Sequence, residues 1–386
     1  MEKVNFNPEW YGVQAKVLSR SERQLVVDYG CNGRGIVKNY SLFEGIQLCF
    51  LDFETDESMR TQKFNPDILQ ITHCQTGRYE CEFANHTVAY LPTGYFSVAT
   101  TAHLPTSFSF PLGKYYGVSL VIDRQALSDE IRRMMRTIPI DLDKIGTTLG
   151  LETQWYVSDT PPQLRHLFSE LYTAIQTEPV GYFKIKAIEL LYHMDQLTQI
   201  SGCDSKYFDK KQIQATKAIR EYLISHLDEK VPLEQLAKEA HLNLSVFHLV
   251  FSHIYGDTPY AYLKKYKMNL AAQWLSENKM KIGDIALELG YSNASKFAKA
   301  FQSVYGMLPK EYRREQKKEK QQTSQQLEQH NYIAGLKKYL NDNTHTHVVS
   351  PISKKQIDFS VNGSSYVLLH TWKKMMTVGR ASDVLI

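Results

Sequence analysis

Two stretches of the chain, about fifty residues apart, place short polar and basic side chains on what helical spacing predicts to be the exposed face of a helix. Each stretch begins at an asparagine suited to capping a helix N-terminus. Such side chains reach base edges and phosphates together when the helix lies in a major groove. We therefore predict double-stranded DNA as the partner of these two faces and of the capping residues Asn243 and Asn293. The faces carry Ser245, His248, Leu249 and Ser252 in the first stretch and Ala294, Ser295, Lys296, Ala298, Lys299 and Gln302 in the second.

The two stretches belong to an internal repeat. Eight identical residues recur at an offset of fifty, from Asn243 and Asn293 at one end to Tyr262 and Tyr312 at the other, and they include a glycine and a proline. This many identities in one register predicts the duplication of one structural unit.

Each copy has the pattern of a helix-turn-helix. In the first copy, apolar residues from Leu233 to Ala240 recur at i, i+3, i+4 and i+7, which predicts a short helix. A turn follows at residues 241–242, and a second helix is expected from the Asn243 cap to Gly256, where a glycine ends it.

A long helix is predicted between the copies, from Pro259 through Glu277, with Thr258 as its cap. Its apolar residues are spaced to pack on both copies. A rigid connection of this kind can hold two recognition helices in successive major grooves, about 34 Å apart. The alternative is a plain helical bundle that contains a duplicated helix pair.

The distribution of charge favours DNA over the plain bundle. Residues 206–320 hold 20 Lys and Arg against 13 Asp and Glu, whereas the whole chain holds 45 against 41. The remainder is therefore slightly acidic, and the excess of positive charge is confined to one segment. This indicates a polyanionic partner for that segment alone.

Signatures of catalysis, metal binding and membrane insertion are missing from the sequence. It contains no Walker-type loop, GxSxG elbow or HExxH pair. Its five cysteines include no CxxC pair, and alternation along a strand would send His73 and Cys74 to opposite faces. No apolar run approaches the roughly 18 residues of a membrane span. We expect a cytoplasmic protein that is not an enzyme and has no cofactor, metal site or membrane partner.

The stretches LEQLAKEAHLN, FSHIYGDTPYAYL, IGDIALELGYSNASKFAKAF and YGMLPKEYRR resemble the AraC/XylS family of regulators, over about 110 residues. The resemblance implies a bacterial regulator in which both helix-turn-helix units contact DNA. It also implies base-contacting roles for Ser245, His248 and Leu249 in the first unit and for Ala294, Ser295, Lys296 and Lys299 in the second.

One of these residues departs from the family pattern. The family usually has Arg or Lys where this chain has Leu249. A leucine can touch a thymine methyl group but cannot donate a hydrogen bond to guanine. We therefore expect the first unit to distinguish sequences weakly, or to recognise methyl pattern and groove shape.

The first two hundred residues have strand spacing as far as Ile122 and helical spacing afterwards. Four strands are predicted at residues 24–29, 46–50, 68–72 and 118–122, and two helices at 164–175 and 182–196. A β-sandwich or small barrel followed by two helices resembles the sensor and dimerisation half of AraC-type regulators. That implies a small-molecule effector, with a sugar as the candidate, and a homodimer formed through residues 160–200. The alternative is a dimerisation scaffold without a ligand.

The end of the chain has a different composition. Residues 316–330 lack an apolar period and predict a solvated linker or a helix extension. The segment from Ile357 resembles the start of family 39 glycoside hydrolases through His370, Trp372, Lys373, Gly379, Arg380 and Ala381. The residues after Gln329 offer only three acids and no room for a barrel of about 250 residues. A truncated fusion without catalysis and an unrelated β-α appendage are equal alternatives.

The sequence thus predicts an α+β chain. A β-rich sensor domain with two following helices is expected over 1–200 and an all-α tandem helix-turn-helix DNA-binding domain over 207–315. The linker at 316–330 and a short appendage at 331–386 complete it. The predicted function is sequence-specific DNA-binding transcription regulation under a small-molecule effector, with RNA polymerase as a further candidate partner. The alternative is a truncated sugar-processing hydrolase fused to a DNA-binding module.

Overall fold

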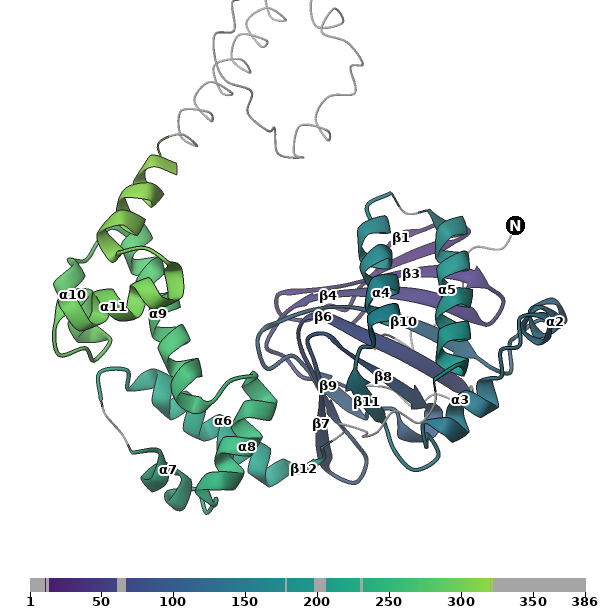
Figure 1. Ribbon diagram of the computed structural model, residues 1–386, viewed down its shortest axis with the longest axis horizontal. Coiled ribbons are helices and arrows are strands. Elements are labelled where there is room, and N and C mark those ends of the chain that lie inside the picture. The colour runs from purple at the N-terminus through teal and green to yellow at the C-terminus, as the bar shows by residue number, and fades with distance from the viewer. Residues whose placement is uncertain are drawn as a thin grey trace, which may run out of the picture. The chain divides into compact units, whose positions relative to one another are not determined.

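The computed structural model describes residues 11, 14–60, 67–177, 179–197, 206–229, 232–319 and 321. Met1–Lys318 form one compact unit. Within it, a β-rich half (residues 14–197) is followed by a helical half (residues 206–318), as Figure 1 shows. The predicted appendage at 331–386, with the six residues that resemble a glycoside hydrolase, lies outside the described residues.

The β-rich half is built on one curved antiparallel sheet with the order β1-β2-β3-β4-β10-β6-β7-β12. All four predicted strands are confirmed, as β2, β4, β6 and β10. The other eight strands of the described residues were not predicted individually, and β11 and β12 lie beyond the region in which strands were expected. The bounds are β1 Lys16–Arg20, β2 Gln24–Asp28, β3 Arg34–Phe43, β4 Ile46–Glu54, β5 Met59–Arg60, β6 Ile68–Glu82, β7 Thr87–Pro92, β8 Tyr95–Thr100, β9 Ser107–Ser109, β10 Lys114–Asp123, β11 Tyr156–Asp159 and β12 Phe208–Asp209.

The longest strand, β6, joins two parts of this sheet. Its first part pairs with β10 and β8, and its last residues, from Arg78 to Glu82, pair with β7 and β9. The register against β10 shifts between Tyr116 and Gly117, which bends the strand at that point. One strand therefore reaches from the centre of the sheet to the edge where the helical half begins.

The two predicted helices of the β-rich half are confirmed as α4 and α5, whereas α2 and α3 were not predicted. A last described helix covers residues 309–319, so the predicted linker at 316–330 begins as a helix extension. The bounds are α2 Asp129–Thr137, α3 Leu142–Thr148, α4 Pro162–Ala174, α5 Val180–Asp195, α6 Lys210–Ser225, α7 Leu233–Glu239, α8 Leu244–Tyr255, α9 Pro259–Glu277, α10 Ile282–Glu288 and α11 Ala294–Tyr305.

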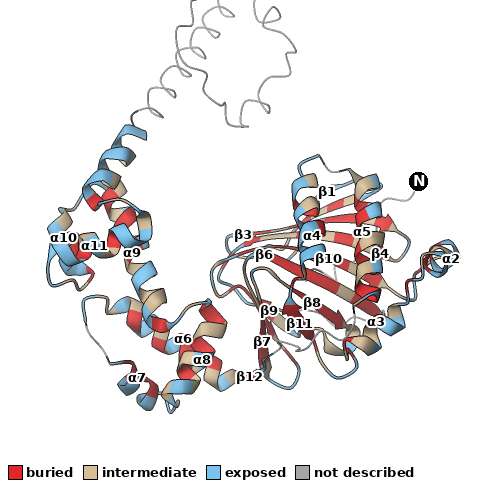
Figure 2. Cartoon of the chain, viewed as in Figure 1, coloured by how far each residue is buried: buried red, intermediate tan, exposed pale blue. Residues whose placement is uncertain are grey.

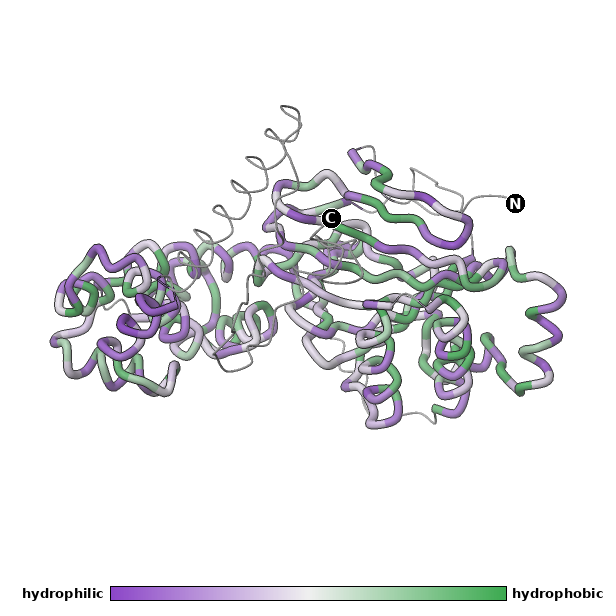
Figure 3. Tube along the Cα trace, turned by 90° about the horizontal axis from the view of Figure 1, so that it is seen from above, coloured by the Kyte–Doolittle hydropathy of each residue, from purple (hydrophilic) through white to green (hydrophobic). Residues whose placement is uncertain are grey.

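Each face of the curved sheet has its own apolar core, because alternate residues of a strand point to opposite faces. One face packs under α4 and α5, where the Phe183 ring lies 5.0 Å from Tyr40 and 5.6 Å from Phe50. The other face closes on itself around Phe53 and Phe110. Buried positions alternate along β2, β3 and β4, whereas β7 and β8 have continuous buried runs. Figure 2 colours the strands by this burial, and Figure 3 colours the chain by hydropathy.

His73 and Cys74 lie on opposite faces of β6, as strand alternation predicts. The imidazole of His73 stacks on Phe168 at 4.3 Å between ring centroids, whereas Cys74 belongs to the opposite core. The Tyr172 hydroxyl donates to the His73 carbonyl (3.1 Å) and lies 2.9 Å from Nδ1. The other ring nitrogen, Nε2, is buried without a hydrogen-bond partner.

This burial makes stability depend on pH. Burial, with Arg165 nearby, lowers the pKa of His73 to about 4. In the unfolded chain the same imidazole takes up its proton near pH 6.5. The free energy of unfolding therefore has its full value above that pH and falls by roughly 3 kcal/mol between pH 6.5 and 4. We expect His73→Phe, which keeps the stacking on Phe168, to lose less free energy of unfolding between pH 7 and pH 4.5 than wild type does. Urea unfolding at the two pH values measures this difference. His166→Gln, at an exposed site, is the control, and a His73→Phe slope equal to that of wild type would refute the prediction.

Candidate DNA-binding surface

The first predicted helix-turn-helix unit is confirmed over residues 233–256. Its first helix is α7, and the Asn243 side chain caps α8 by accepting from the Ser245 amide at 2.8 Å. Along α8, the residues Phe247, Val250, Phe251 and Ile254 are fully buried. Gly256 ends the helix with φ +82°, a left-handed conformation that glycine adopts without strain.

The second unit repeats this construction over residues 282–306. The Asn293 side chain caps α11 by accepting from the Lys296 amide at 2.9 Å. Phe297 and Phe301 occupy the buried positions that correspond to Phe247 and Phe251 in the first unit. The repeat seen in the sequence is therefore a repeat of structure.

The predicted connecting helix is confirmed as α9, with Thr258 as its cap. Its first turns pack on the first unit, where Tyr262 lies 5.5 Å from Phe251. Its later turns bury Met268, Ala271, Ala272 and Leu275 in the core of the second unit. The Lys267 ammonium group donates to the carbonyl of Leu227, at 2.6 Å, and to that of Leu289, at 2.9 Å. These bonds join the loop after α6 and the end of α10 to the connecting helix α9.

Most of the predicted base-contacting side chains are exposed. In the second unit Ala294, Ser295, Lys296 and Lys299 all lie on the outer side of α11, away from Phe297 and Phe301. In the first unit Ser245 is exposed, Leu249 is 46% exposed, and His248 is half-buried. The exposed apolar Leu249 has no role in the core, which is what a contact with a partner requires.

The β-rich half contains a cavity of about 120 Å³ on the face of its sheet that does not pack under α4 and α5. Polar side chains enter it from four strands. Asn39 donates to the Tyr11 hydroxyl (3.1 Å) and to Gln47 (2.7 Å), while its own carbonyl oxygen is buried without a partner. Gln70 and Ser119 lie on the same wall, and none of the lining side chains is charged.

These cavity residues were not predicted from the sequence. The available signal was polar residues at inward positions of predicted strands, such as Gln47 on β4 and Gln70 on β6. This signal does not identify a cavity from sequence alone, because pairing with distant strands decides which face of each strand points inward. Within the described residues no group of His, Cys, Asp and Glu side chains could hold a metal ion, and no helix is long and apolar enough to cross a bilayer.

Comparison with known proteins supports the helix-turn-helix assignment. Residues 236–315 match the family model described as "Helix-turn-helix domain". The probable transcriptional regulator LumQ of Photobacterium leiognathi is 32% identical over 107 residues, which cover 27% of this chain and 43% of LumQ. The transcriptional activator RclR of Escherichia coli is 38% identical over 81 residues, covering 21% of this chain and 28% of RclR.

Two solved structures also align with the chain. The DNA-binding domain of the transcriptional factor AdpA, in complex with a target DNA, covers 26% of this chain and 89% of its own, with 21% identity and a TM-score of 0.25. ToxT from Vibrio cholerae covers 70% of this chain and 97% of its own, with 12% identity and a TM-score of 0.27. With TM-scores this low, the sequence matches alone establish the shared segment.

Residues 236–315 are therefore a helix-turn-helix domain, and the two capped helices α8 and α11 are the second helices of its two units. The resemblance of this segment to the AraC/XylS regulators is confirmed. The chain spans less than half the length of LumQ and RclR.

Proposed function

We propose that the chain is a transcription regulator that binds duplex DNA through both helix-turn-helix units and acts in the bacterial cytoplasm. The observation that carries this proposal is the pair of Asn-capped recognition helices, α8 and α11, fixed to one connecting helix. The basic charge of this segment suits a polyanion, and relatives that share the segment carry the names of transcription regulators.

In this proposal α11 supplies most of the sequence discrimination. Lys296 and Lys299 bring two positive charges to the outer face of α11, close to two short side chains that let the helix approach the bases. The first unit brings Ser245, His248 and Leu249, whose contacts suit thymine methyl groups and groove shape rather than guanine.

The effector proposal rests on the cavity of the β-rich half. Its uncharged lining and the unpaired oxygen of Asn39 suit a small neutral molecule with hydroxyl donors, a description that includes small sugars. Binding would couple to DNA only if the molecule prefers one arrangement of the two halves. The competing idea of a scaffold without a ligand gains no support from a cavity lined with hydrogen-bonding groups.

A homodimer through residues 160–200 fits the exposed apolar side chains of α5, because Ile185 is 65% exposed and Tyr192 is 40% exposed. RNA polymerase is a further candidate partner. A catalytic role is not proposed. The relative AdaA of Bacillus subtilis, a bifunctional transcriptional activator and DNA repair enzyme, is 33% identical over only 101 residues and 26% of this chain.

Selection from a pool of random duplexes with the full chain, followed by sequencing, tests the proposed function. We expect a bipartite motif with its halves separated by about one helical turn. A steep salt dependence of binding without any recovered motif would mean phosphate contacts alone and would contradict sequence-specific recognition.

Leu249→Arg tests whether the first unit reaches the DNA. An arginine here restores the charge that the family pattern has and can contact a guanine or a phosphate. We expect the variant to bind the selected duplex about 5- to 100-fold more tightly at low salt, with a salt slope steeper by about one. Leu249→Ala controls for loss of the leucine, and unchanged affinity for Leu249→Arg would place α8 away from the groove.

A further inference from the structure

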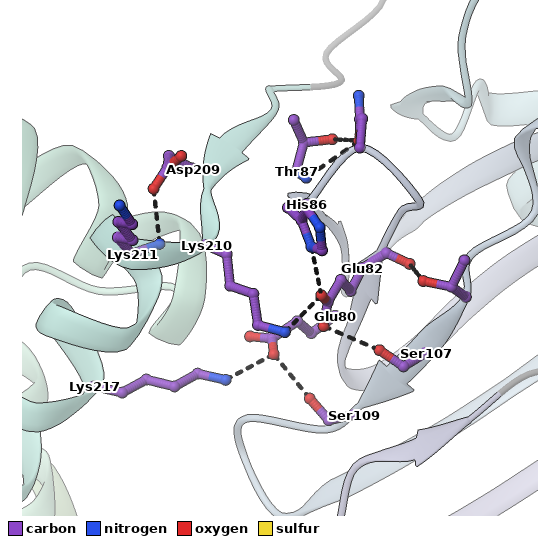
Figure 4. Close-up of polar contacts among 12 residues, drawn as sticks. Glu80, Glu82, His86, Thr87, Ser107, Ser109, Asp209, Lys210, Lys211 and Lys217 are labelled. Atoms are coloured by element: carbon purple, nitrogen blue, oxygen red, sulfur yellow. Dashed lines mark hydrogen bonds and ion pairs between the residues drawn. The ribbon is translucent and has the colours of Figure 1, made fainter.

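The acidic end of β6 contacts the first helix of the helical half. Glu80 accepts from the Lys217 ammonium group at 2.7 Å, and Glu82 accepts from that of Lys210 at 2.6 Å. Figure 4 shows both lysines reaching from α6 to the strand. The Glu80 side chain is only 12% exposed and that of Glu82 only 23%, so water screens these pairs less than ordinary surface ion pairs.

The two carboxylates are held in place from their own side. Ser109 donates to Glu80 at 2.9 Å and Ser107 to Glu82 at 3.1 Å. Tyr90 donates to the second oxygen of Glu80 at 2.7 Å. Burial opposes ionisation of Glu82, but the bonds from Lys210 and Ser107 outweigh it and hold its pKa below the ordinary value. Glu82 is therefore ionised, and the hydrogen bonds from the serines and Tyr90 hold both carboxylates in place beside the helical half.

A third contact from the same strand reaches the recognition helix α8. The guanidinium of Arg78 donates to the carbonyls of Ser252, at 3.4 Å, and of His253. These are among the last carbonyls of α8, where the helix dipole favours a positive charge. A side chain on Gly256 would begin 3.2 Å from the Arg78 guanidinium, so glycine also makes room for this contact.

Because of these contacts, part of the outer face of α8 lies opposite the β-rich half. His248 and Leu249 line a cleft of about 610 Å³ whose opposite wall includes Pro92, Thr93 and Tyr95. A cleft of this volume holds roughly twenty water molecules. The walls of a major groove stand about 12 Å apart, and phosphates border both sides. A duplex therefore cannot enclose α8 while the β-rich half lies across this cleft from His248 and Leu249.

We propose that the acidic end of β6 is a docking surface for the chain's own first helix-turn-helix unit and competes with DNA for it. Glu80 and Glu82 neutralise two lysines of the basic segment, and Arg78 holds α8 with its base-contacting residues toward the β-rich half. This interface, the β6 clamp (Arg78, Glu80, Glu82, Lys210 and Lys217), opens when the first unit engages DNA. The inference rests on the proposed DNA binding.

The test compares two charge-matched double variants of the full chain. Glu80→Gln with Glu82→Gln removes the clamp pairs and keeps the size of both side chains. Asp52→Asn with Glu54→Gln makes the same change of charge on β4, where these carboxylates pair with Arg34 and Lys114 inside the β-rich half. Fluorescence anisotropy measures the Kd of each for a duplex carrying the selected bipartite site.

We expect the clamp variant to bind about 5- to 30-fold more tightly than the β4 control, the gain that two broken pairs of this kind give. Hydrogen exchange of residues 244–255 without DNA should become faster in the clamp variant only. Equal affinities in the two variants would overturn the proposal, because the effect would then be one of net charge. Failure of wild type and both variants alike to bind any duplex would instead refute the proposed function.

A charge exchange decides the matter if the glutamine variant does not fold. Glu82→Lys places a second ammonium group against that of Lys210. The two positive charges repel each other, so the clamp should open and DNA binding should tighten. Adding Lys210→Glu restores an ion pair of reversed sign and the original net charge, and the Kd should return to the wild-type value. A pair of substitutions that leaves the Kd at the level of Glu82→Lys alone would overturn the β6 clamp.

Discussion

Phe301→Ala is expected to lower the free energy of unfolding of the second helix-turn-helix unit by about 3–5 kcal/mol, the usual cost of truncating a buried phenylalanine. The Phe301 side chain is fully buried. It stacks on Tyr305 at 4.6 Å and meets Phe297 and Tyr312 edge-on or tilted, within 6 Å. Alanine would leave these three rings around an empty volume.

The damage should stay within the second unit, because its core is separate from that of the first unit. Urea unfolding followed by tryptophan fluorescence is a suitable measurement, since Trp274 packs against the second core. Ser303→Ala, on the exposed side of the same helix, is the matched control and should cost under about 0.5 kcal/mol. A loss below about 1 kcal/mol for Phe301→Ala would mean that this core does not hold the unit together.

Lys299→Ala should weaken binding to the selected duplex by about 1–3 kcal/mol and relax the preference at one base position. The physical reason is that an exposed lysine on a recognition helix can donate to guanine, which alanine cannot. Lys211→Ala removes an equal charge from the first turn of α6, where the side chain is exposed and lies on neither α8 nor α11. This control should weaken binding to all DNA sequences equally, and by less than Lys299→Ala weakens binding to the selected duplex. An unchanged base preference in Lys299→Ala would remove this residue from the base contacts.

The helix-turn-helix units could be predicted from the sequence because their signals are local. Asn243 and Asn293 cap the helices they precede, and the glycines at 256 and 306 end them with φ values of +82° and +74°. The phenylalanine spacing fixes the buried face without reference to any other part of the chain. Because the unit is duplicated, each of these signals occurs twice, and the second occurrence supports the interpretation of the first.

The contacts between the two halves could not be predicted in this way. Glu80 and Lys217 are separated by 137 positions, and neither carboxylate nor lysine is unusual in its own stretch of sequence. Strand β12 has two residues and exists because Phe208 pairs with Val88 on β7. The helices α2 and α3 follow a change of period that the sequence showed, but their short lengths gave too few turns for a pattern.

Hydroxyl-radical footprinting of the full chain on the duplex recovered by selection tests whether both helix-turn-helix units contact the DNA. Two helix-turn-helix units fixed to α9 should protect two segments on one face of the duplex, with centres about 10 base pairs apart. Phe301→Ala should erase the segment contacted by α11 and leave the other. A single protected segment in the wild-type chain, or two segments on opposite faces of the duplex, would contradict DNA recognition by both units.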